Sequence, residues 1–388
     1  MNNITTILGQ ILQVIPRNRF QTFVNAGGAD RYVKTFSTWI QLVTLVTAQI
    51  KGWRSLREVQ TGFMSNSKKL YHLGFKSIPK RSNLSYANTN RSHKIFESLF
   101  YELLKRFQGK LIGKKLKFRA PLYLFDSTYI DLCIGIFDWA KFRYNKGAIK
   151  LHTSFEVQEQ IPNFVNITDG KVHDLDGIRQ DYSVYSDSIV CFDRAYSDID
   201  FFAGLDDVGA TFVTRLKKRI RYKIVGQHSI HFRGGVLKDE IIELSTEKSY
   251  EKYPQKLRLV TYYDKEKGKT YKFVTNNFKY GANTIANIYK LRWEIELFFK
   301  WIKQNLKIKT SLGTSQNAVK IQIWVAMITY LMLAYMKSQS SYPYSILEFT
   351  RITRELLFDY MSLVDIFSAN FESISKIRDP DPSQLAMI

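Results

Sequence analysis

The sequence changes character twice along its length, and this succession limits the folds that the chain can adopt. Up to residue 115, apolar residues recur mostly at helical spacing. From Pro121 to Asn277 the chain is rich in β-branched and aromatic runs separated by turn residues. Helical periodicity then returns from about Asn283 to Phe367. The order predicts an α/β fold in which a helical part precedes a β-rich core that is interrupted by an insertion.

The strand-like runs can be assigned individually. In the first half of the core, strands are expected at Ile149–Phe155, Phe164–Thr168, Ser188–Phe192 and Ala210–Leu216, with a short helix at Ile199–Leu205. Beyond Ile220 the strand-like runs are "IIELSTEK", "KLRLVTYYD" and "TYKFVTNNF", separated by turns such as "RGG" and "KEKGK". The latter group is the expected insertion.

The chain is strongly basic. Its formal net charge is +22, from 57 Lys and Arg against 35 Asp and Glu. Such an excess predicts a polyanionic partner, because every neutralised phosphate releases counterions. A soluble basic protein without such a partner is the alternative. The basic residues are densest in Lys105–Arg119, Arg215–Lys223 and Lys300–Lys309.

One polar, basic segment of the N-terminal part has two open interpretations. It reads "MSNSKKLYHLGFKSIPKRSNLSYANTNRS" and combines Ser and Asn with Lys68, Lys69, Lys76, Lys80, Arg81 and Arg91. Short polar side chains and cations together suit contacts to phosphates. A solvated loop between helices would have the same composition.

The cysteines and the most apolar run exclude several classes of protein. Cys133 and Cys191 form no disulfide framework and no zinc motif, which fits a reducing cytoplasm. The N-terminus lacks the basic start and cleavage site of a signal peptide. The run Ile321–Met336 is shorter than the roughly 20 residues of a membrane span, so we expect a buried core helix and no membrane partner.

Two aspartates follow or interrupt apolar strand-like runs. Asp126 lies within "LYLFDSTYI", and Asp193 follows "SIVCF". Burying a lone carboxylate is costly, so each is expected to have a partner. Asp193 could instead cap the turn that follows it.

A third carboxylate lies in "YKLRWEIELFFKWIK", which begins at Tyr289. On a continuous helix, at about 100° per residue, Tyr289, Arg292, Glu296 and Lys303 fall within an arc of about 60°, whereas Glu294 points away. A charged stripe surrounded by aromatic residues favours a site over simple solvation, although Arg–Glu pairs at this spacing are common on surfaces.

Together the three acids suggest a metal-dependent reaction. Asp126, Asp193 and Glu296 could hold two Mg²⁺ ions, which prefer oxygen ligands and leave room for water and phosphate. Two ions about 4 Å apart stabilise the attacking and leaving oxygens of a phosphoryl transfer. Arg292 and Lys303 would then bind phosphates beside the acids.

These residues resemble a known family. The pattern Y-x2-R-x3-E-x6-K, formed here by Tyr289, Arg292, Glu296 and Lys303, is similar to the signature of the insertion-sequence-four (IS four) family of bacterial DDE transposases. The boxes "FDST" and "FDRAYSD" around Asp126 and Asp193 also resemble that family, as does "KGAIKLH". The resemblance extends from about Pro121 to Met336.

The resemblance implies a ribonuclease-H-like catalytic core with a β-rich insertion, preceded by a helical DNA-binding domain. The expected division is 1–115 for the helical DNA-binding domain, 116–219 for the first part of the core, 220–280 for the insertion, 281–375 for the helical C-terminal part of the core, and 376–388 for a tail. Asp126, Asp193 and Glu296 would be the metal ligands, with two Mg²⁺ ions that Mn²⁺ can replace. Tyr289, Arg292 and Lys303 would contact DNA.

The implied activity is that of a DNA transposase, which cuts at the inverted-repeat ends of its element and joins the 3′-hydroxyls to target DNA. Its partner would be double-stranded DNA, bound by a homodimer in the bacterial cytoplasm in association with the nucleoid. A ribonuclease-H-like nuclease without strand transfer and a catalytically inactive DNA-binding protein are the alternatives.

Several weaker candidates remain. Trp139 could stack on an unpaired base or belong to the core. His152 could lie near the site or be structural, and Arg194 could contact a phosphate or pair with an acid. The rival carboxylates are Asp131, Asp169, Asp174 and Asp176.

Overall fold

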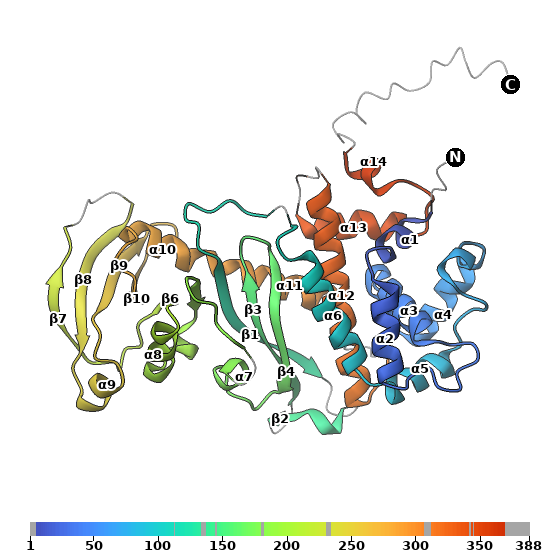
Figure 1. Cartoon of the computed structure of the whole chain (residues 1–388), viewed down its shortest axis with the longest axis horizontal. Helices are drawn as coiled ribbons and strands as arrows, with labels where there is room; N and C mark the ends of the chain where they lie inside the picture. Colours follow the sequence, from blue (N-terminus) through green and yellow to red (C-terminus); the bar gives the residue numbers. More distant parts are fainter. Residues whose placement is uncertain are drawn as a thin grey trace, which may run out of the picture. The chain divides into compact units, whose positions relative to one another are not determined.

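The computed structural model describes residues 5–111, 113–132, 137–143, 146–179, 182–229, 234–305, 312–340, 343 and 345–368 (Figure 1). The chain divides into two compact units. Unit 1 comprises residues 1–107, 310–313 and 321–388, and unit 2 comprises residues 108–309 and 314–320. Residues after 321 therefore belong with the N-terminal helices, which differs from the expected division at residue 281. The expected tail at 376–388 lies outside the described residues.

Unit 2 is built on one ten-stranded sheet. Its strands are β1 (Leu122–Leu132), β2 (Lys141–Arg143), β3 (Lys146–Glu156), β4 (Ile161–Asp169), β5 (Ile189–Phe192), β6 (Thr211–Arg215), β7 (Tyr222–Gln227), β8 (Val236–Leu244), β9 (Leu257–Asp264) and β10 (Lys269–Thr275). Its helices are η3 (Asp138–Ala140), α7 (Asp176–Arg179), η4 (Arg194–Tyr196), α8 (Ile199–Asp207), α9 (Glu247–Lys252), α10 (Ala282–Leu291) and α11 (Trp293–Asn305).

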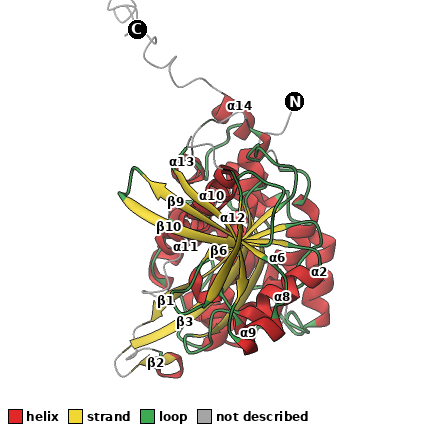
Figure 2. Cartoon of the chain, turned by 90° about the vertical axis from the view of Figure 1, so that its left-hand side faces the viewer, coloured by secondary structure: helices red, strands yellow, loops and turns green. Residues whose placement is uncertain are grey.

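The sheet has two halves that differ in strand direction. In the first half, β4, β3 and β1 are antiparallel neighbours, and β5 and β6 continue the sheet parallel to β1. In the second half, β10, β9, β8 and β7 extend the same sheet from β6 with antiparallel pairing. Figure 2 shows the strands fanning out, which reflects the right-handed twist of a large sheet. The strands expected from residue 220 onward therefore enlarge the central sheet.

The strand register brings two aspartates next to each other. Phe125 of β1 pairs with Phe192 of the parallel strand β5, so Asp126 and Asp193 are the next residues on adjacent strands. Phe125 and Phe192 belong to a buried aromatic cluster with Phe201 of α8. Because side chains alternate along a strand, Asp126 points to the other face.

Helix α11 covers that other face. Phe298 of α11 packs on Phe155 of β3, with ring centroids 5.3 Å apart. Phe155 pairs with Leu124, which shares its face with Asp126. The apolar side of α11 therefore holds the helix against the strand that carries the first aspartate.

The segment from Tyr289 to Lys303 is not one continuous helix, and that part of our sequence interpretation is wrong. Helix α10 ends at Leu291, Arg292 caps it, and α11 begins at Trp293. The break lies between two helices that pack on different strands: α10 contacts β5, β6, β8, β9 and β10, whereas α11 contacts β1. Packing against a twisted sheet has overridden the continuous helical periodicity.

Unit 1 is helical. Its elements are α1 (Ile7–Leu12), α2 (Arg17–Ala26), α3 (Thr38–Lys51), α4 (Leu56–Ser65), η1 (Ser67–Lys69), η2 (Tyr71–Leu73), α5 (Arg81–Asn90), α6 (Lys94–Phe107), α12 (Gln316–Gln339, from residue 321 on), α13 (Ile346–Leu356) and α14 (Leu363–Ser368). Helix α3 is buried along nearly its whole length and forms the centre of the unit. Phe107 of α6 stacks on Tyr335 of α12 at 4.3 Å, so the C-terminal helices complete the N-terminal core.

Helix α12 contains the most apolar run of the sequence. Among the described residues it is the one helix long and apolar enough to cross a membrane by length and composition. However, 83% of its apolar window is buried inside the protein. This burial matches the core helix expected from the sequence.

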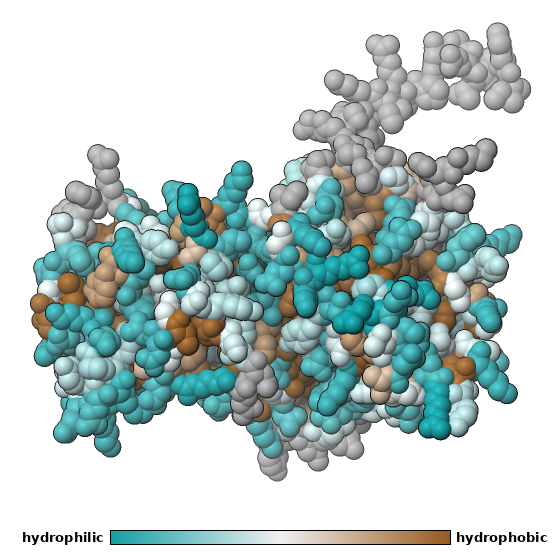
Figure 3. Space-filling view, viewed as in Figure 1, coloured by the Kyte–Doolittle hydropathy of each residue, from teal (hydrophilic) through white to brown (hydrophobic). Residues whose placement is uncertain are grey.

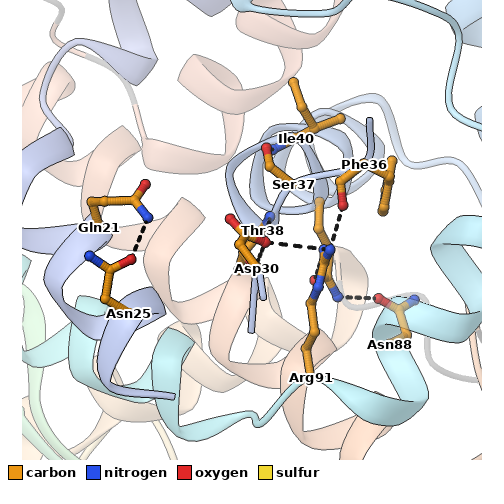
Figure 4. Close-up of polar contacts among 10 residues, drawn as sticks. Gln21, Asn25, Asp30, Phe36, Ser37, Thr38, Ile40, Asn88 and Arg91 are labelled. Carbon is orange, nitrogen blue, oxygen red and sulfur yellow. Dashed lines mark hydrogen bonds and ion pairs between the residues drawn. The ribbon is translucent and has the colours of Figure 1, made fainter. Parts of the chain in front are cut away.

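A buried polar network lies at the C-terminal end of the basic segment of unit 1 (Figure 4). Arg91 donates to the carbonyl of Phe36 and to Gln41 (3.1 Å), and lies 3.5 Å from a carboxylate oxygen of Asp30. Gln41 in turn donates to Asn88 of α5 at 2.9 Å. Arg91 is only 8% exposed, so this cation of the segment is structural and does not face a phosphate.

Candidate active site

Three carboxylates from three elements line one pocket of about 480 Å³ in unit 2. They belong to Asp126 of β1, Asp193 directly after β5, and Glu296 of α11. The rest of the lining consists of Ser127, Thr128, Arg292, Phe299, Lys300, Lys303 and Gln304. The pocket therefore combines acids and bases, which is a composition suited to a polyanion and its counterions.

Asp126 is held in place from two sides. The backbone N–H of Ser127 donates to one carboxylate oxygen at 2.8 Å, and Arg292 donates to the other at 3.1 Å. Burial raises the pKa of Asp126 to about 6, and the nearby charges of Asp193 and Glu296 add to that rise against the opposing effect of Arg292. Asp193 and Glu296 are therefore each close enough to Asp126 to disfavour its charge.

Arg292 bridges two of the acids. One guanidinium nitrogen donates to Asp126, and the other donates to Glu296 one helical turn away. Burial lowers the pKa of Arg292, but the neighbouring Tyr289, Asp126 and Glu296 together outweigh it and raise the pKa. A cation thus already lies between the first and third carboxylates.

Asp193 combines the two roles that the sequence left open. Its carboxylate accepts from the backbone N–H of Arg194 and caps the short helix η4, as a strand-end aspartate can. The same side chain lines the pocket. The capping bond orients the carboxylate, so the structural role does not compete with a role in the pocket.

Lys303 and Tyr289 lie in different surroundings. Lys303 is exposed at the rim of the pocket, next to Lys300. Tyr289 instead lines a neighbouring pocket of about 110 Å³, which it shares with Arg292. Its ring lies 4.7 Å from that of Phe273, and its hydroxyl is buried without a hydrogen-bond partner. Tyr289 nevertheless stays next to the charged stripe, since the Arg292 guanidinium lies 5.9 Å from the centre of its ring.

Sequence reasoning missed a second layer behind the pocket. The Ser127 hydroxyl donates to Asp174, and the nearly buried ammonium of Lys150 lies 2.7 Å from the same carboxylate oxygen. Lys150 also donates to the carbonyl of Val172 at 2.9 Å. Ser127 follows Asp126, so this buried pair fixes the strand next to the first acid. The run "KGAIKLH" contains Lys150 and was the available signal.

The weaker candidates have mostly structural surroundings. Trp139 donates its indole N–H to the carbonyl of Thr314 at 3.0 Å. His152 is fully buried and bonds Thr168, and burial lowers its pKa to about 4. Arg194 is half-buried beside Asp193. None of the rival acids lines the pocket: Asp131, Asp169 and Asp176 are exposed, and Asp174 pairs with Lys150.

The donor set fits a hard divalent cation in chemistry. Three carboxylates face one pocket, and a bound cation would offset both the burial that raises the pKa of Asp126 and the smaller contribution of the neighbouring acids. Within the described residues, however, no three His, Cys, Asp or Glu side chains are already gathered closely enough to hold a metal ion. Arg292 accounts for part of this spacing, because its guanidinium lies between Asp126 and Glu296.

Comparisons with known proteins cover most of the chain. Residues 117–332 match the family model described as "Transposase DDE domain", and residues 3–76 match a "Domain of unknown function (DUF4372)". A protein of Sinorhizobium fredii named as transposase y4zB is 32% identical over 292 residues, which cover 74% of this chain and 80% of that protein.

Two further relatives are named as transposases of insertion sequence elements. One, from Geobacillus stearothermophilus and assigned to element IS5377, is 26% identical over 90% of this chain and 91% of its own length. The other, from Synechocystis and assigned to element IS4SA, is 26% identical over 77% of this chain and 80% of its own length. The matched family model spans more than half of the chain, including all three carboxylates of the pocket.

Membership of that family implies a ribonuclease-H-like core, a DNA partner and the use of divalent metal ions in DNA cleavage and transfer. The mixed sheet and the acidic pocket are consistent with these properties. The chain belongs to the DDE transposases of insertion sequence elements.

Proposed function

We propose that this transposase belongs to the IS four branch, binds the inverted-repeat ends of its own element, cleaves them and joins the freed 3′-hydroxyls to target DNA. The observation that carries the proposal is the shared pocket of Asp126, Asp193 and Glu296, with Arg292 and Lys303 in its wall. The four residues of the family signature support the branch, as does the name of the Synechocystis relative.

We assign the three carboxylates as ligands of two Mg²⁺ ions, for which Mn²⁺ can substitute. When bound, such ions stabilise the charge on attacking and leaving oxygens of a phosphoryl transfer. The chain supplies the remaining requirements. Ser127 and Lys150 hold Asp126 in place through the strand, while Lys303 and Lys300 offer exposed ammonium groups to the DNA backbone.

Arg292 has a second role in this proposal. In the free protein it neutralises Asp126 and Glu296. If the carboxylates held cations, its guanidinium would be freed for a DNA phosphate, for which its planar donors are suited. Tyr289 lies in the adjacent pocket and would contact DNA there, separately from the three acids.

The experiment combines purified protein, Mg²⁺ and labelled DNA from the inverted repeats that bracket the gene. Joined products support transposition. Cleavage without joining would indicate a nuclease, and bound but uncut DNA would indicate an inactive DNA-binding protein. Asp126→Asn and Glu296→Gln should each abolish cleavage and leave DNA binding within about twofold, because a metal ligand is lost rather than a phosphate contact. Normal cutting by either variant would refute the assignment.

The assembly and location are also proposed. Joining two ends requires that both be held together, so we propose a homodimer on DNA, in the bacterial cytoplasm in association with the nucleoid. Light scattering of the protein with and without end DNA measures the number of chains in the complex. A complex of one chain per pair of ends would exclude it.

A further inference from the structure

A long stretch of unit 1 carries basic residues and no acid. Residues 59–96 contain seven Lys or Arg and no Asp or Glu. Arg91 is buried and Lys69 pairs with Asp359, but Lys68, Lys76, Lys80 and Arg81 are exposed. This part of the surface therefore attracts polyanions, and a duplex with its dense phosphates is the polyanion that a transposase must bind.

Helix α5 lies within this stretch and has two unlike faces. Its inner face buries Leu84, Ala87 and Asn88. Its outer face exposes Ser82, Tyr86, Thr89 and Asn90, of which Tyr86 is 71% exposed. Every side chain of the outer face is neutral and carries a group that can donate and accept hydrogen bonds, which is the chemistry used to read base edges.

The composition of α5 is poor for a helix. Six of its ten residues are Ser, Asn or Thr, which favour caps and turns over helix interiors. On a solvent-exposed face, alanine or glutamate would stabilise the helix better. The polar residues therefore reduce stability, and a contact made by their side chains would account for their presence.

The inner side of α5 is held rigidly by polar contacts. Asn88 accepts from Gln41 of α3 and donates to the carbonyl of Leu312, at 2.9 Å each. Arg91, directly after the helix, binds the segment that precedes α3 through the carbonyl of Phe36 and the carboxylate of Asp30 (Figure 4). The outer face is thus presented on a fixed support, as precise recognition requires.

The outer face of α5 is polar throughout. In the space-filling view, hydrophilic side chains cover most of the visible surface, with only small hydrophobic patches (Figure 3). The outer face of α5 itself offers no aliphatic side chain, so it lacks the apolar stripe that a partner helix or a membrane surface needs.

We propose that α5 is the helix that reads the transposon ends, entering the major groove of duplex DNA with Ser82, Tyr86 and Asn90. The proposal rests on the proposed function, and neither matched family model covers α5, which lies between residues 76 and 117. Ten residues span about 15 Å, and the major groove, about 12 Å wide, admits a helix. The exposed cations before and at the start of the helix bind the flanking phosphates.

The test selects binding sites from a pool of random-sequence duplexes, using the full-length chain. The wild type should enrich one sequence, which we expect to recur in the inverted repeats beside the gene. Ser82→Ala and Tyr86→Ala should each lower the preference for that sequence over random duplex about tenfold or more. Their binding to random duplex should change less than about twofold, since phosphate contacts remain.

Matched controls exclude a general loss of structure. Thr22→Ala on α2 and Tyr360→Ala after α13 remove comparable exposed side chains of unit 1 and should leave the preference unchanged. Ser82→Ala should also melt at or slightly above the wild-type temperature, because alanine is the better helix former. Reduced recognition at equal or greater stability is a result that a purely structural role for Ser82 does not give.

Other results would overturn the inference. One is an unchanged preference in both α5 variants, and another is the absence of an enriched sequence for the wild type. A third is tighter binding of an acidic protein such as casein than of duplex DNA. Cleavage and joining of the selected duplex are measured separately. If the ends are joined but α5 variants read them normally, the proposed function stands without this inference. If α5 reads a sequence that is never cut, the inference stands and the catalytic assignment is wrong.

Discussion

Replacing Arg292 by alanine tests whether the three carboxylates form a cation site. The guanidinium donates to Asp126 at 3.1 Å and also binds Glu296, and the three side chains are 19%, 21% and 32% exposed. Breaking a fully buried ion pair costs about 3–5 kcal/mol, and an exposed one about 0–1 kcal/mol. For this intermediate burial we expect Arg292→Ala to destabilise the metal-free protein by about 2 kcal/mol.

The same variant should bind Mg²⁺ more tightly. In the wild type an ion must displace Arg292, whereas in the variant it meets two unpaired carboxylates. If the displaced interaction is about 2 kcal/mol, the midpoint of a Mg²⁺ titration should fall about 30-fold. Saturating Mg²⁺ should then restore most of the lost stability, because a ligand that binds only the folded state stabilises it.

The assay is thermal unfolding at pH 8, first in EDTA and then across a Mg²⁺ series. Lys114→Ala is the matched control: Lys114 forms a 2.6 Å ion pair with Glu294 on the same helix, outside the pocket. It should lower stability slightly without moving the Mg²⁺ midpoint. Equal Mg²⁺ midpoints for Arg292→Ala and the wild type would refute competition for shared carboxylates.

Three further predictions concern single residues. Burial raises the pKa of Glu156 to about 7, above its usual 4.5, so folding stability falls as pH rises through this window. Glu156→Gln should therefore raise the free energy of unfolding at pH 8 by up to about 3 kcal/mol and change it little at pH 4. Equal gains at both pH values would contradict this. A Cβ on Gly177 would lie 2.3 Å from His152 ring atoms, so Gly177→Ala should destabilise the folded protein by about 2 kcal/mol. Gly204→Ala on α8, which has open space around it, should not, and equal melting temperatures of the two variants would refute this. Lys303→Ala should weaken DNA binding and reduce the salt slope by about one, and an unchanged slope would count against a phosphate contact.

The parts of the site that sequence could predict are those fixed by short-range patterns. Asp126 and Asp193 each follow apolar strand runs, and parallel pairing of those runs brings the next residues together. Glu296 could be placed beside Arg292 because four-residue spacing persists within and at the start of a helix. The local patterns sufficed for the individual residues, and the one long-range assumption was that the two strands lie next to each other in the sheet.

The parts that sequence could not predict depend on long-range packing. The break at Arg292 has no Pro or Gly to mark it, since it follows from the different strands on which α10 and α11 pack. The Lys150–Asp174 ion pair joins two segments, and nothing in the sequence of either segment indicates that they contact each other. The assignment of residues after 321 to the N-terminal unit depends on which apolar helix faces match, and apolar periodicity alone does not encode that choice.

The pairing of β1 with β5 has a consequence for how the acids can vary. Adjacent strands are held about 4.8 Å apart by main-chain hydrogen bonds, so the gap between the backbones of Asp126 and Asp193 is nearly independent of the side chains around them. The position of Glu296 depends instead on how Phe298 and its neighbours seat a helix. Mutations that accumulate in the core would therefore alter the third acid first, and loss of activity in drifting copies should trace to α11 more often than to the strands.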